Sequence, residues 1–387
     1  MTASIPMPFR GRNIPHLVIE VNQACNMSCR ACYKARASYT KPLDLIRDEV
    51  DLAISQRNLD MITLAGGEPT LHPELPDVIT YIKDRGIKVS LLTNGLTLTD
   101  ELLAQYKAAG LARVMVHVDA HQNRPDAPDD ATETDLNELR ESMLERVSSH
   151  GLRGGLAMTL YRRSLHEFPD LLEFLFSSPN ASLLLVTCCR SFAPIARRHG
   201  AEDRAATMDD RDLVEDEVTT AEVMDVVEQR LGIVPTHHIP SSHRATERRW
   251  IFYLLFCIVG RDGETRLMYL EPRFKRTIAA ANGLQKLVKG RYKFDMVPKP
   301  FEAVVVCLAY AVLGLSPTTL WRTLKFLWNL RRRGSRIQSK VVVVQQLPNL
   351  TEEGEIEYCE NCPDATVRDG EVVQLCMADI LKPVRQE

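Results

Sequence analysis

The sequence predicts an α/β fold in which an open sheet of parallel strands is followed by a smaller α+β region. From His16 to about Arg190, six short apolar, β-branched runs alternate with amphipathic segments of helical period. Strands that alternate with helices in this way are joined by right-handed crossovers and therefore lie parallel. With 387 residues, of which 45% are hydrophobic, the chain can bury a full core and hold more than one structural unit.

Each expected element is recognisable from a local pattern. The strands are short apolar runs, and the helices place apolar residues three and four positions apart. The expected strands are His16–Val21, Met61–Ala65, Lys88–Thr93, Arg113–Asp119, Gly155–Leu160 and Ser182–Thr187. The expected helices between them are Asp48–Arg57, Leu75–Arg85, Asp100–Ala109, Asp135–Ser149 and Leu165–Phe176.

The composition changes after the sixth expected strand. Residues 197–217 are dense in charge and poor in large apolar side chains, so we expect an exposed loop or a weak helix there. A helical pattern follows over Thr219–Leu231. We expect His237–His243, which contains three histidines, to be a loop. Loop histidines are usually solvated, and a metal-ligand role is the alternative.

Beyond residue 250 the pattern predicts a second unit. Trp250–Gly260 and Arg266–Leu270 are apolar runs on either side of a turn and are expected to form a hairpin. Three helical patterns follow at 278–289, 301–315 and 317–336. The expected division is therefore 1–190 for the region of alternating strands and helices, 191–249 for a connector and 250–387 for a C-terminal domain.

Charge and cysteine content exclude several classes of protein. The net charge of −3 argues against a general nucleic-acid binder. The first fifteen residues lack the apolar stretch of a secretory signal peptide. The ten cysteines include C-x3-C-x2-C and C-x2-C spacings, which indicate metal binding in a reducing compartment rather than a disulfide framework. We therefore expect a cytoplasmic protein with no nucleic-acid partner.

Three cysteines follow the first expected strand. Cys25, Cys29 and Cys32 have C-x3-C-x2-C spacing in the loop directly after His16–Val21. Such a loop can present three thiolates to three irons of a four-iron cluster, which leaves the fourth iron without a protein ligand. A zinc site is the alternative, but it needs a fourth Cys or His nearby and the local sequence has none.

A second motif lies about one βα unit downstream. Gly66, Gly67, Glu68 and Pro69 follow the expected strand Met61–Ala65. Glycine allows a backbone to approach a ligand closely where a Cβ would collide. An ordinary Gly-Gly turn after a strand is the alternative.

The two motifs together resemble the radical S-adenosylmethionine (SAM) superfamily. The resemblance implies a partial (β/α)6 barrel with its chemistry at the C-terminal ends of the strands, as in full (β/α) barrels. It also implies a [4Fe-4S] cluster whose open iron chelates SAM, with the SAM amino group held by Gly66, Gly67 and Glu68. One electron from such a cluster cleaves SAM and yields a 5′-deoxyadenosyl radical.

Two further strand ends are similar to SAM-binding segments of this family. Thr93 and Asn94 end the third expected strand, and His117 stands where many relatives have a serine that contacts the SAM carboxylate. Many relatives also have an aromatic residue just before the third cysteine. This chain has Ala31 there and Tyr33 after the cysteine, so its adenine contacts differ from the family pattern.

Three more cysteines lie near the C-terminus. Cys359, Cys362 and Cys376 form a C-x2-C-x13-C array, and the turn at 368–371 would return Cys376 beside the pair if it closes a hairpin. The array looks similar to the auxiliary-cluster regions of SPASM and Twitch type, although its spacing departs from the full SPASM pattern. The resemblance implies a second [4Fe-4S] cluster and a C-terminal α+β auxiliary-cluster domain. A zinc knuckle or a structural turn is the alternative.

A cluster held by these three thiolates needs a fourth ligand or an open iron. Cys188, Cys189 and Cys257 are the candidates for that ligand. Cys188 and Cys189 end the sixth expected strand, where either could ligate, deliver a hydrogen atom or bind substrate. The alternative for these two is a small buried residue. Cys257 and Cys307 lie in apolar runs and are by default core residues.

The segment 303–336 joins an apolar run to a pattern rich in tryptophan and arginine. The apolar run, Val304–Leu315, is shorter than the roughly twenty apolar residues that span a membrane. Residues 317–336 are either an interfacial helix at the inner face of the membrane or core helices with a solvated basic end.

The function expected from these features is that of a radical SAM enzyme which abstracts hydrogen from an unactivated C–H bond. An electron donor such as flavodoxin or ferredoxin is the implied partner. A lipid or other hydrophobic substrate is the first expectation, and a peptide or small metabolite is the alternative. A non-catalytic iron–sulfur electron carrier is disfavoured, because a carrier has no need of the Gly-Gly-Glu-Pro segment.

Overall fold

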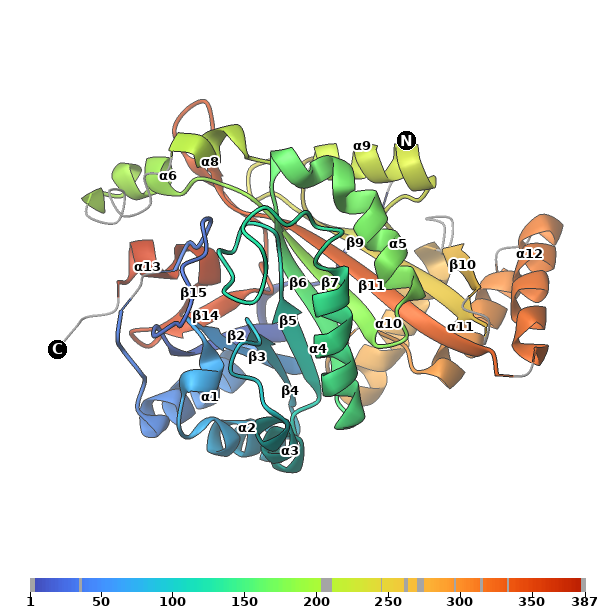
Figure 1. Ribbon diagram of the computed structural model, residues 1–387, viewed down its shortest axis with the longest axis horizontal. Helices are drawn as coiled ribbons and strands as arrows, with labels where there is room; N and C mark the ends of the chain where they lie inside the picture. Colours follow the sequence, from blue (N-terminus) through green and yellow to red (C-terminus); the bar gives the residue numbers. More distant parts are fainter. Residues whose placement is uncertain are drawn as a thin grey trace.

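The computed structural model describes residues 4–34, 37–202, 211–244, 246–260, 264–269, 275–295, 297–313, 316–332 and 334–383. Within these residues, one mixed sheet of eleven strands runs through the molecule, and helices cover its outer face (Figure 1). Six consecutive parallel strands with their connecting helices form the partial barrel. The strands are β2 (His16–Asn22), β3 (Met61–Gly66), β4 (Lys88–Thr93), β5 (Arg113–His117), β6 (Arg153–Leu160) and β7 (Ala181–Cys188).

The helices between these strands lie where the sequence predicts them. They are α1 (Leu43–Gln56), α2 (Leu75–Asp84), α3 (Asp100–Ala109), α4 (Asn137–Ser149) and α5 (Phe168–Ser177). The prediction of a (β/α)6 partial barrel in an α/β fold is therefore confirmed, with boundaries that differ by a few residues. The expected helix Thr219–Leu231 is also confirmed as α9 (Thr220–Leu231), which begins with a capping box between Thr219 and Glu222.

The two faces of the barrel sheet have different surroundings. On β2, Leu17, Ile19 and Val21 belong to the core cluster that includes α1, α2 and α3, whereas Val18 and Glu20 line an internal cavity. This alternation follows from the two-residue period of a strand. The helices therefore cover the outer face, and the inner face is available for a site.

The sheet continues past β7 through strands from the C-terminal half of the chain. β11 (Arg336–Gln346) pairs in parallel with β7 and antiparallel with β9 (Arg248–Val259), as the long strands crossing Figure 1 show. β10 (Thr265–Tyr269) pairs antiparallel with β9, which confirms the expected hairpin. The expected boundaries at 190 and 250 stay a prediction, although the sheet itself is continuous from β7 to β11 and β9.

Two expectations differ from the structure. Residues 237–240 are a strand, β8 (His237–Pro240), which lies between β9 and β1 (Ile5–Pro6), so the expected loop His237–His243 is wrong over that part. Backbone pairing on both sides outweighs the local preference of this polar segment. The expected helix 317–336 ends at Trp328 in α12 (Pro317–Trp328), because Arg336 already begins β11.

The remaining elements are short or lie outside the barrel. The helices are α6 (Ala193–Arg198), α8 (Arg211–Glu215), α10 (Lys275–Lys289), α11 (Pro300–Leu313) and α13 (Ala378–Leu381). The strands are β12 (Asn349–Leu350), β13 (Ile356–Glu357), β14 (Ala365–Arg368) and β15 (Glu371–Gln374). None of the helices in the described part of the chain combines the length and apolar character needed to cross a bilayer.

The hairpin β14–β15 packs beside β2, the edge strand of the barrel. Its turn has positive φ at Asp369 and Gly370, which suits an Asp-Gly hairpin. From β14, Arg368 donates to Glu20 on β2 at 2.5 Å and to Asp379 at 3.0 Å. Lys34 of the cysteine loop pairs with the same two carboxylates, so a buried charge network joins the C-terminal hairpin to the barrel.

Residues 291–295 cross beneath the N-terminal ends of the barrel strands. The Arg291 guanidinium donates to the carbonyl oxygens of Leu59 at 2.7 Å and Gly86 at 2.9 Å. Phe294 stacks on His16 with ring centroids 4.0 Å apart. The Asp295 carboxylate pairs with Arg113 at 2.6 Å and with Arg153. This segment therefore forms the floor of the barrel.

Removal of the Asp295 carboxylate should destabilise the fold. Burial would raise the pKa of Asp295, but Arg113 and Arg153 hold it well below its usual range, so the group is a carboxylate in the folded protein. Asp295→Ala leaves the buried Arg113 without its partner, and we expect the free energy of unfolding to fall by about 3 kcal/mol. Urea unfolding measures this loss.

The control Asp84→Ala breaks the exposed pair with Lys83 and should change the free energy of unfolding by less than about 0.5 kcal/mol. Equal losses of unfolding free energy in the two variants would contradict the interpretation that the Asp295 ion pairs stabilise the fold.

Candidate functional site

A cavity of about 230 Å³ lies on the inner face of the barrel sheet. Its walls are mainly apolar and come from strands far apart in sequence, and its polar groups gather at the C-terminal ends of the strands. The apolar lining includes Val18, Met61, Leu92, Met115, Leu185, Trp250, Phe294 and Val343. The polar groups include Cys25, Cys29, Cys32, Thr93, Asn94, His117, Asp119 and Gln122. A mainly apolar cavity with a few convergent polar groups is typical of a ligand site.

The cysteine loop leaves the end of β2 and returns beside it. The Gln23 N–H donates to the carbonyl of Tyr39 at 2.7 Å, and the Lys41 N–H donates to that of Val21 at 3.0 Å. Cys25, Cys29 and Cys32 all line the cavity, so the structure brings together the three residues that the sequence singles out. No disulfide joins the ten cysteines, all of which lie in the described part of the chain.

The three thiols interact electrostatically. Burial raises the pKa of Cys29 to about 12, and the neighbouring charges of Cys32 and Asp119 add to the shift. Burial also raises the pKa of Cys25. Among the described residues, no three His, Cys, Asp or Glu side chains are already gathered closely enough to hold a metal ion. The cysteines therefore share one cavity, and their role as ligands stays a prediction.

The Gly66-Gly67 pair packs directly against the cysteine loop. A Cβ on Gly67 would collide with the carbonyl oxygen of Ala24 and lie 2.6 Å from that of Gln23. The N–H groups of Gly67 and Glu68 donate to the carbonyls of Asn22 at 3.1 Å and Ala24 at 2.8 Å. The sequence suggests glycine here for close approach to a ligand, but close approach to the loop backbone already requires it. Both glycines also line the cavity.

Glu68 is fully buried and does not line the cavity. Its Oε1 accepts hydrogen bonds from the hydroxyls of Thr70 and Thr93, each at 2.6 Å, and its Oε2 accepts from the Asn94 N–H at 2.7 Å. These donors come from the end of β4 as well as from the motif itself. The carboxylate therefore joins the ends of β3 and β4 and positions the residues around it.

Thr93 and Asn94 line the cavity at the end of β4. The Asn94 amide donates to Oδ1 of Asn26 at 2.7 Å, which ties this strand end to the residue after Cys25. The Thr93 hydroxyl donates to Glu68. Both predicted residues are thus beside the cysteine loop, and their backbone and side-chain groups are fixed by hydrogen bonds.

His117 lines the cavity at the end of β5 and lies 3.0 Å from Asp119 through its Nε2. Burial would raise the pKa of Asp119, but hydrogen bonds from His117 and from the N–H groups of Thr159 and His121 hold it below its usual value. A buried carboxylate in this position orients the imidazole. Asp119 is a site residue that the sequence analysis did not single out, although it is the last residue of the expected strand Arg113–Asp119.

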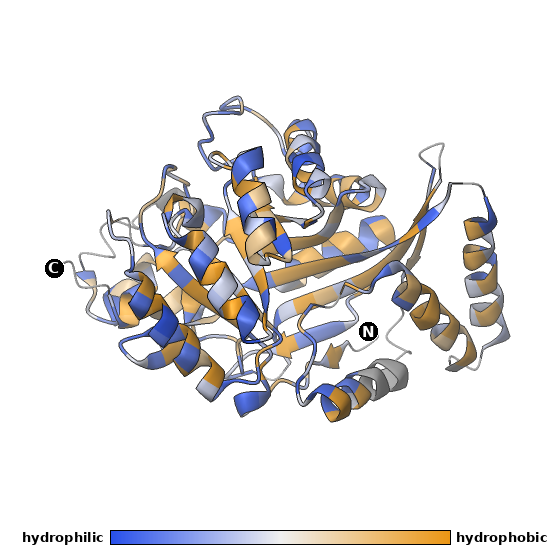
Figure 2. Cartoon of the chain, turned by 90° about the horizontal axis from the view of Figure 1, so that it is seen from below, coloured by the Kyte–Doolittle hydropathy of each residue, from blue (hydrophilic) through white to orange (hydrophobic). Residues whose placement is uncertain are grey.

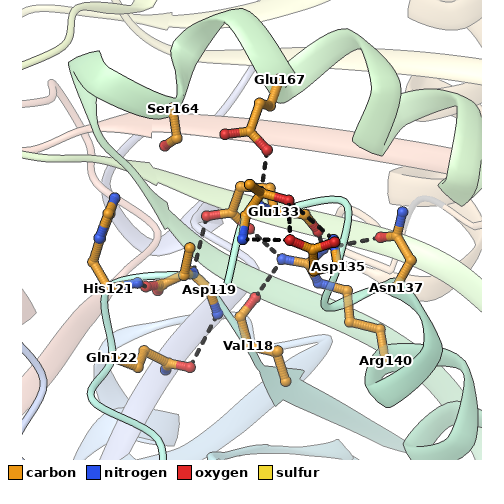
Figure 3. A network of polar contacts seen from close by, with 12 residues as sticks. Val118, Asp119, His121, Gln122, Glu133, Asp135, Asn137, Arg140, Ser164 and Glu167 are labelled. Atoms are coloured by element: carbon orange, nitrogen blue, oxygen red, sulfur yellow. Dashed lines mark hydrogen bonds and ion pairs between the residues drawn. The ribbon is translucent and has the colours of Figure 1, made fainter. Parts of the chain in front are cut away.

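Gln122 is a second residue that the sequence analysis missed. Its Oε1 accepts from the Asp119 N–H at 3.0 Å and from Arg124 at 3.3 Å, and Figure 3 shows the side chain turned toward Asp119. The residue is 1% exposed, and its Nε2 has no hydrogen-bond partner in the structure. A buried amide donor that lines a cavity without a partner is a candidate to bind a ligand.

A buried network holds the loop that carries Asp119 and Gln122. Glu133 accepts from the N–H of Ala120 at 3.0 Å and pairs with Arg140, which also donates to the carbonyl of Val118 at 3.0 Å (Figure 3). Burial raises the pKa of Glu133 despite the neighbouring Arg140. No sequence signal identified this network, because its members are joined through a loop and a helix rather than by a motif.

Cys359, Cys362 and Cys376 come together at the base of the C-terminal hairpin. Cys362 precedes β14 and Cys376 follows β15, so the predicted return of Cys376 is confirmed by the strand pairing. A hydrogen bond with Cys359 and burial raise the pKa of Cys362, and the charge of Cys359 adds to the effect of burial on Cys376. Tyr33, next to Cys32, is half-buried; desolvation raises its pKa, and the charge of Cys376 is the next largest cause.

The three proposed fourth ligands do not join this group. Cys257 belongs to the outer core cluster, on the opposite face of β9 from Trp250 and Phe252, which pack with Cys359 and Cys362. Cys188 lies in the same outer cluster. Cys189 packs with Tyr161 and lines the main cavity instead. The default assignment of Cys257 and Cys307 to the core agrees with their complete burial.

Asp364 and Arg57 lie beside the C-terminal cysteines. Asp364 lies 3.0 Å from Nδ1 of His16 and lines the main cavity. Arg57 donates to the carbonyl of Pro363 at 3.2 Å. Burial lowers the pKa of Arg57, and the charges of Cys362, Asp364 and Cys359 oppose that shift. The cysteine group thus adjoins the cavity and has a buried cation next to it.

Similarity to known proteins covers part of the chain. The chain is 33% identical over 111 residues to an AdoMet-dependent heme synthase of Methanosarcina barkeri, covering 28% of this chain and 32% of that protein. It is 26% identical over 171 residues to the tungsten-containing aldehyde ferredoxin oxidoreductase cofactor-modifying protein of Pyrococcus furiosus, covering 42% of this chain and 48% of that protein. The chain thus spans about a third to a half of the length of these curated relatives.

Among solved structures, the chain is similar to Streptococcus suis SuiB bound to the precursor peptide SuiA, with a TM-score of 0.39 and 16% identity. That similarity covers 56% of this chain and 47% of SuiB. Residues 19–175 match the family model of the Radical SAM superfamily. These residues include Cys25, Cys29, Cys32 and the Gly66-Gly67-Glu68 segment. This chain therefore carries a domain of the Radical SAM superfamily over residues 19–175.

Proposed function

We propose that this protein is a radical SAM enzyme that abstracts hydrogen from an unactivated C–H bond of a hydrophobic substrate. The observation that carries the proposal is the position of three thiols and the Gly66-Gly67 pair at one end of an apolar cavity. Thiolates are the ligands that iron–sulfur clusters require, so the donor set fits a [4Fe-4S] cluster with one open iron. When bound, that cluster would supply the electron that cleaves SAM into methionine and a 5′-deoxyadenosyl radical.

The residues of the chain would have distinct tasks. Cys25, Cys29 and Cys32 hold the cluster, and the backbone of Gly66 and Gly67 lies beside it for the SAM amino group. Glu68 acts as a positioning residue, because its carboxylate already accepts hydrogen bonds from Thr70, Thr93 and Asn94. At the ends of β4 and β5, beside the cysteine loop, Thr93, Asn94, His117 and Gln122 would offer polar groups to SAM.

The apolar wall favours a hydrophobic substrate such as a lipid. Side chains of Met61, Leu92, Met115 and Val343 would exclude water from the reacting centre, which protects a radical from side reactions. A peptide or small metabolite is the alternative. The charged residues Glu20 and Lys34, which also line the cavity, favour that alternative.

A second [4Fe-4S] cluster at Cys359, Cys362 and Cys376 is part of the proposal. The three thiols lie at the base of the β14–β15 hairpin near the cavity, and the buried Arg57 guanidinium lies beside them. A zinc site is the alternative for this group. We further propose a cytoplasmic enzyme that receives electrons from a donor such as flavodoxin or ferredoxin and contacts the inner face of the membrane through residues 317–336.

Production of 5′-deoxyadenosine tests the proposed activity. Anaerobically reconstituted, reduced protein should form it from SAM, and a lipid extract should stimulate the rate more than a water-soluble peptide and metabolite fraction. Cys29→Ala should reduce production to background, because one cluster ligand is lost. Cys307→Ala, a buried cysteine of α11, should retain the activity. Stimulation by the soluble fraction alone would replace the lipid by the peptide or metabolite alternative, and no product under any condition would refute the enzyme.

The contact between Gly67 and the cysteine loop provides a second test. Gly67→Ala adds a methyl group that collides with the Ala24 carbonyl, so the loop must move. We expect iron binding at Cys25, Cys29 and Cys32 to weaken by about tenfold or more, since roughly 1.4 kcal/mol of lost loop positioning suffices for that factor. Iron per chain is measured in a background that lacks Cys359 and Cys362.

Gly283→Ala is the matched control for this substitution. It adds the same methyl group to α10 at a position with no atom within 4 Å and should leave the iron content unchanged. Equal iron content in the Gly67 and Gly283 variants would show that the loop tolerates the displacement.

The Nε2 of Gln122, which has no hydrogen-bond partner, gives a third test. Gln122→Leu removes a buried donor, and loss of one hydrogen bond to a charged ligand should raise the Kd for SAM about tenfold. Equilibrium binding of SAM to the reconstituted protein measures the effect. Gln56→Leu, an exposed change at the end of α1, serves as the control. An unchanged Kd in the Gln122 variant would remove this residue from the SAM site.

A further inference from the structure

Three helices of the C-terminal half lie beside the extended strands β9, β10 and β11, outside the barrel (Figure 1). α11 packs on α12 and on β11, α12 packs on β10, and α10 contacts α11. The inner side of α11 places Ala303, Cys307 and Tyr310 in a core cluster with Phe256 and Ile258 of β9. One side of these helices is therefore a normal core interface.

The outer side of α11 is also apolar. Phe301, Val305, Leu308 and Val312 are spaced four, three and four residues apart, so they lie along one face of the helix. Their exposed fractions run from 43% for Leu308 to 79% for Phe301. A second apolar face that no part of the described chain covers is unusual for a soluble protein.

The two neighbouring helices have the same feature. α12 exposes Leu320, Trp321, Leu324 and Trp328, and the two tryptophans are 69% and 65% exposed. α10 exposes Leu284, Leu287 and Val288. Figure 2 shows α11 as mainly hydrophobic and α12 with hydrophobic and hydrophilic residues interspersed, at the right of that view. We call these eleven exposed side chains of α10, α11 and α12 the docking face.

The charge around the docking face is strongly positive. Residues 275–336 contain 13 Lys and Arg and 2 Asp and Glu, a net charge of +11, in a chain whose total is −3. The rest of the chain is therefore net −14. Lys325 is exposed on α12, and the Arg331 guanidinium lies 4.0 Å from the ring of Trp328. Basic groups thus lie among the exposed apolar residues.

We infer that the docking face binds the surface of an anionic phospholipid bilayer. Tryptophan and leucine insert into the boundary between headgroups and acyl chains, while lysine and arginine pair with the phosphates. A second copy of this chain fits less well, because two copies of this basic segment would repel each other. A nucleic acid would use the charge but would leave eleven apolar side chains in water.

The docking face is connected to the cavity through the floor segment. Residues 291–295 lie between α10 and α11 in the sequence and include Phe294, which lines the cavity, and Asp295, which pairs with Arg113. A bilayer bound at α10 and α11 would therefore contact the two helices that flank this segment in the sequence. On this point the inference rests on the proposed function: the substrate would be a lipid taken from the bound membrane.

Flotation of the full chain with vesicles tests the docking face. Protein should bind vesicles of phosphatidylcholine with phosphatidylglycerol, bind vesicles of phosphatidylcholine alone at least tenfold more weakly, and lose affinity as salt rises. Trp321→Ser with Trp328→Ser, and separately Lys325→Glu, should each weaken binding about tenfold. The matched controls are Leu45→Ser and Lys83→Glu, exposed residues of α1 and α2, and both should bind as the wild type does.

Several outcomes would overturn the inference. These are equal binding to both vesicle types, no loss in the α12 variants, dimerisation that the tryptophan variant abolishes, or binding of RNA in preference to vesicles. The test is also independent of the proposed chemistry. Cys29→Ala should bind vesicles normally while forming no 5′-deoxyadenosine. Production of 5′-deoxyadenosine without vesicle binding would refute only the proposed membrane binding. Vesicle binding by a wild-type protein that forms no 5′-deoxyadenosine would refute only the proposed enzyme activity.

Discussion

The close approach of Gly67 to the carbonyl oxygens of Gln23 and Ala24 is the constraint on which the rest of the site depends. It brings the cysteine loop onto the end of β3, where two backbone hydrogen bonds fix it. Glu68, the next residue, then joins β3 to β4 through Thr93 and Asn94. A buried carboxylate is stable there because four hydrogen bonds from protein donors replace those of water. The loop and two strand ends thus form one rigid unit.

The cavity beside this unit is closed by segments from distant parts of the chain. Residues 291–295 form its floor, β11 extends its wall, and the β14–β15 hairpin covers the edge of β2. Buried ion pairs hold two of these contacts, at Asp295 and at Glu20. Such pairs specify position because a displaced partner would leave an uncompensated charge in a low-dielectric interior. The result is a cavity with mainly apolar walls, and the three cysteines and the Gly66-Gly67 pair line it at the C-terminal ends of the strands.

The C-terminal half of the chain supplies part of the cavity lining. Outside the barrel, it presents an exposed apolar surface. α11 has one apolar face against β9 and β11 and another that is exposed, and the surrounding charge is opposite in sign to that of the rest of the chain. The floor segment between α10 and α11 joins these two roles. Part of the cavity lining, Phe294, and the docking face therefore belong to the same stretch of the sequence.

The sequence by itself determined the six strands, the helices between them and the two cysteine groups. These depend on local period, spacing and turn chemistry, such as the Asp369-Gly370 turn that returns Cys376. Tertiary structure alone decided that β11 lies between β7 and β9 and that His237–Pro240 is a strand. It also decided the burial of Glu68, the unpartnered amide of Gln122 and the exposed outer face of α11. These features depend on contacts between residues far apart in the chain, which no local pattern specifies.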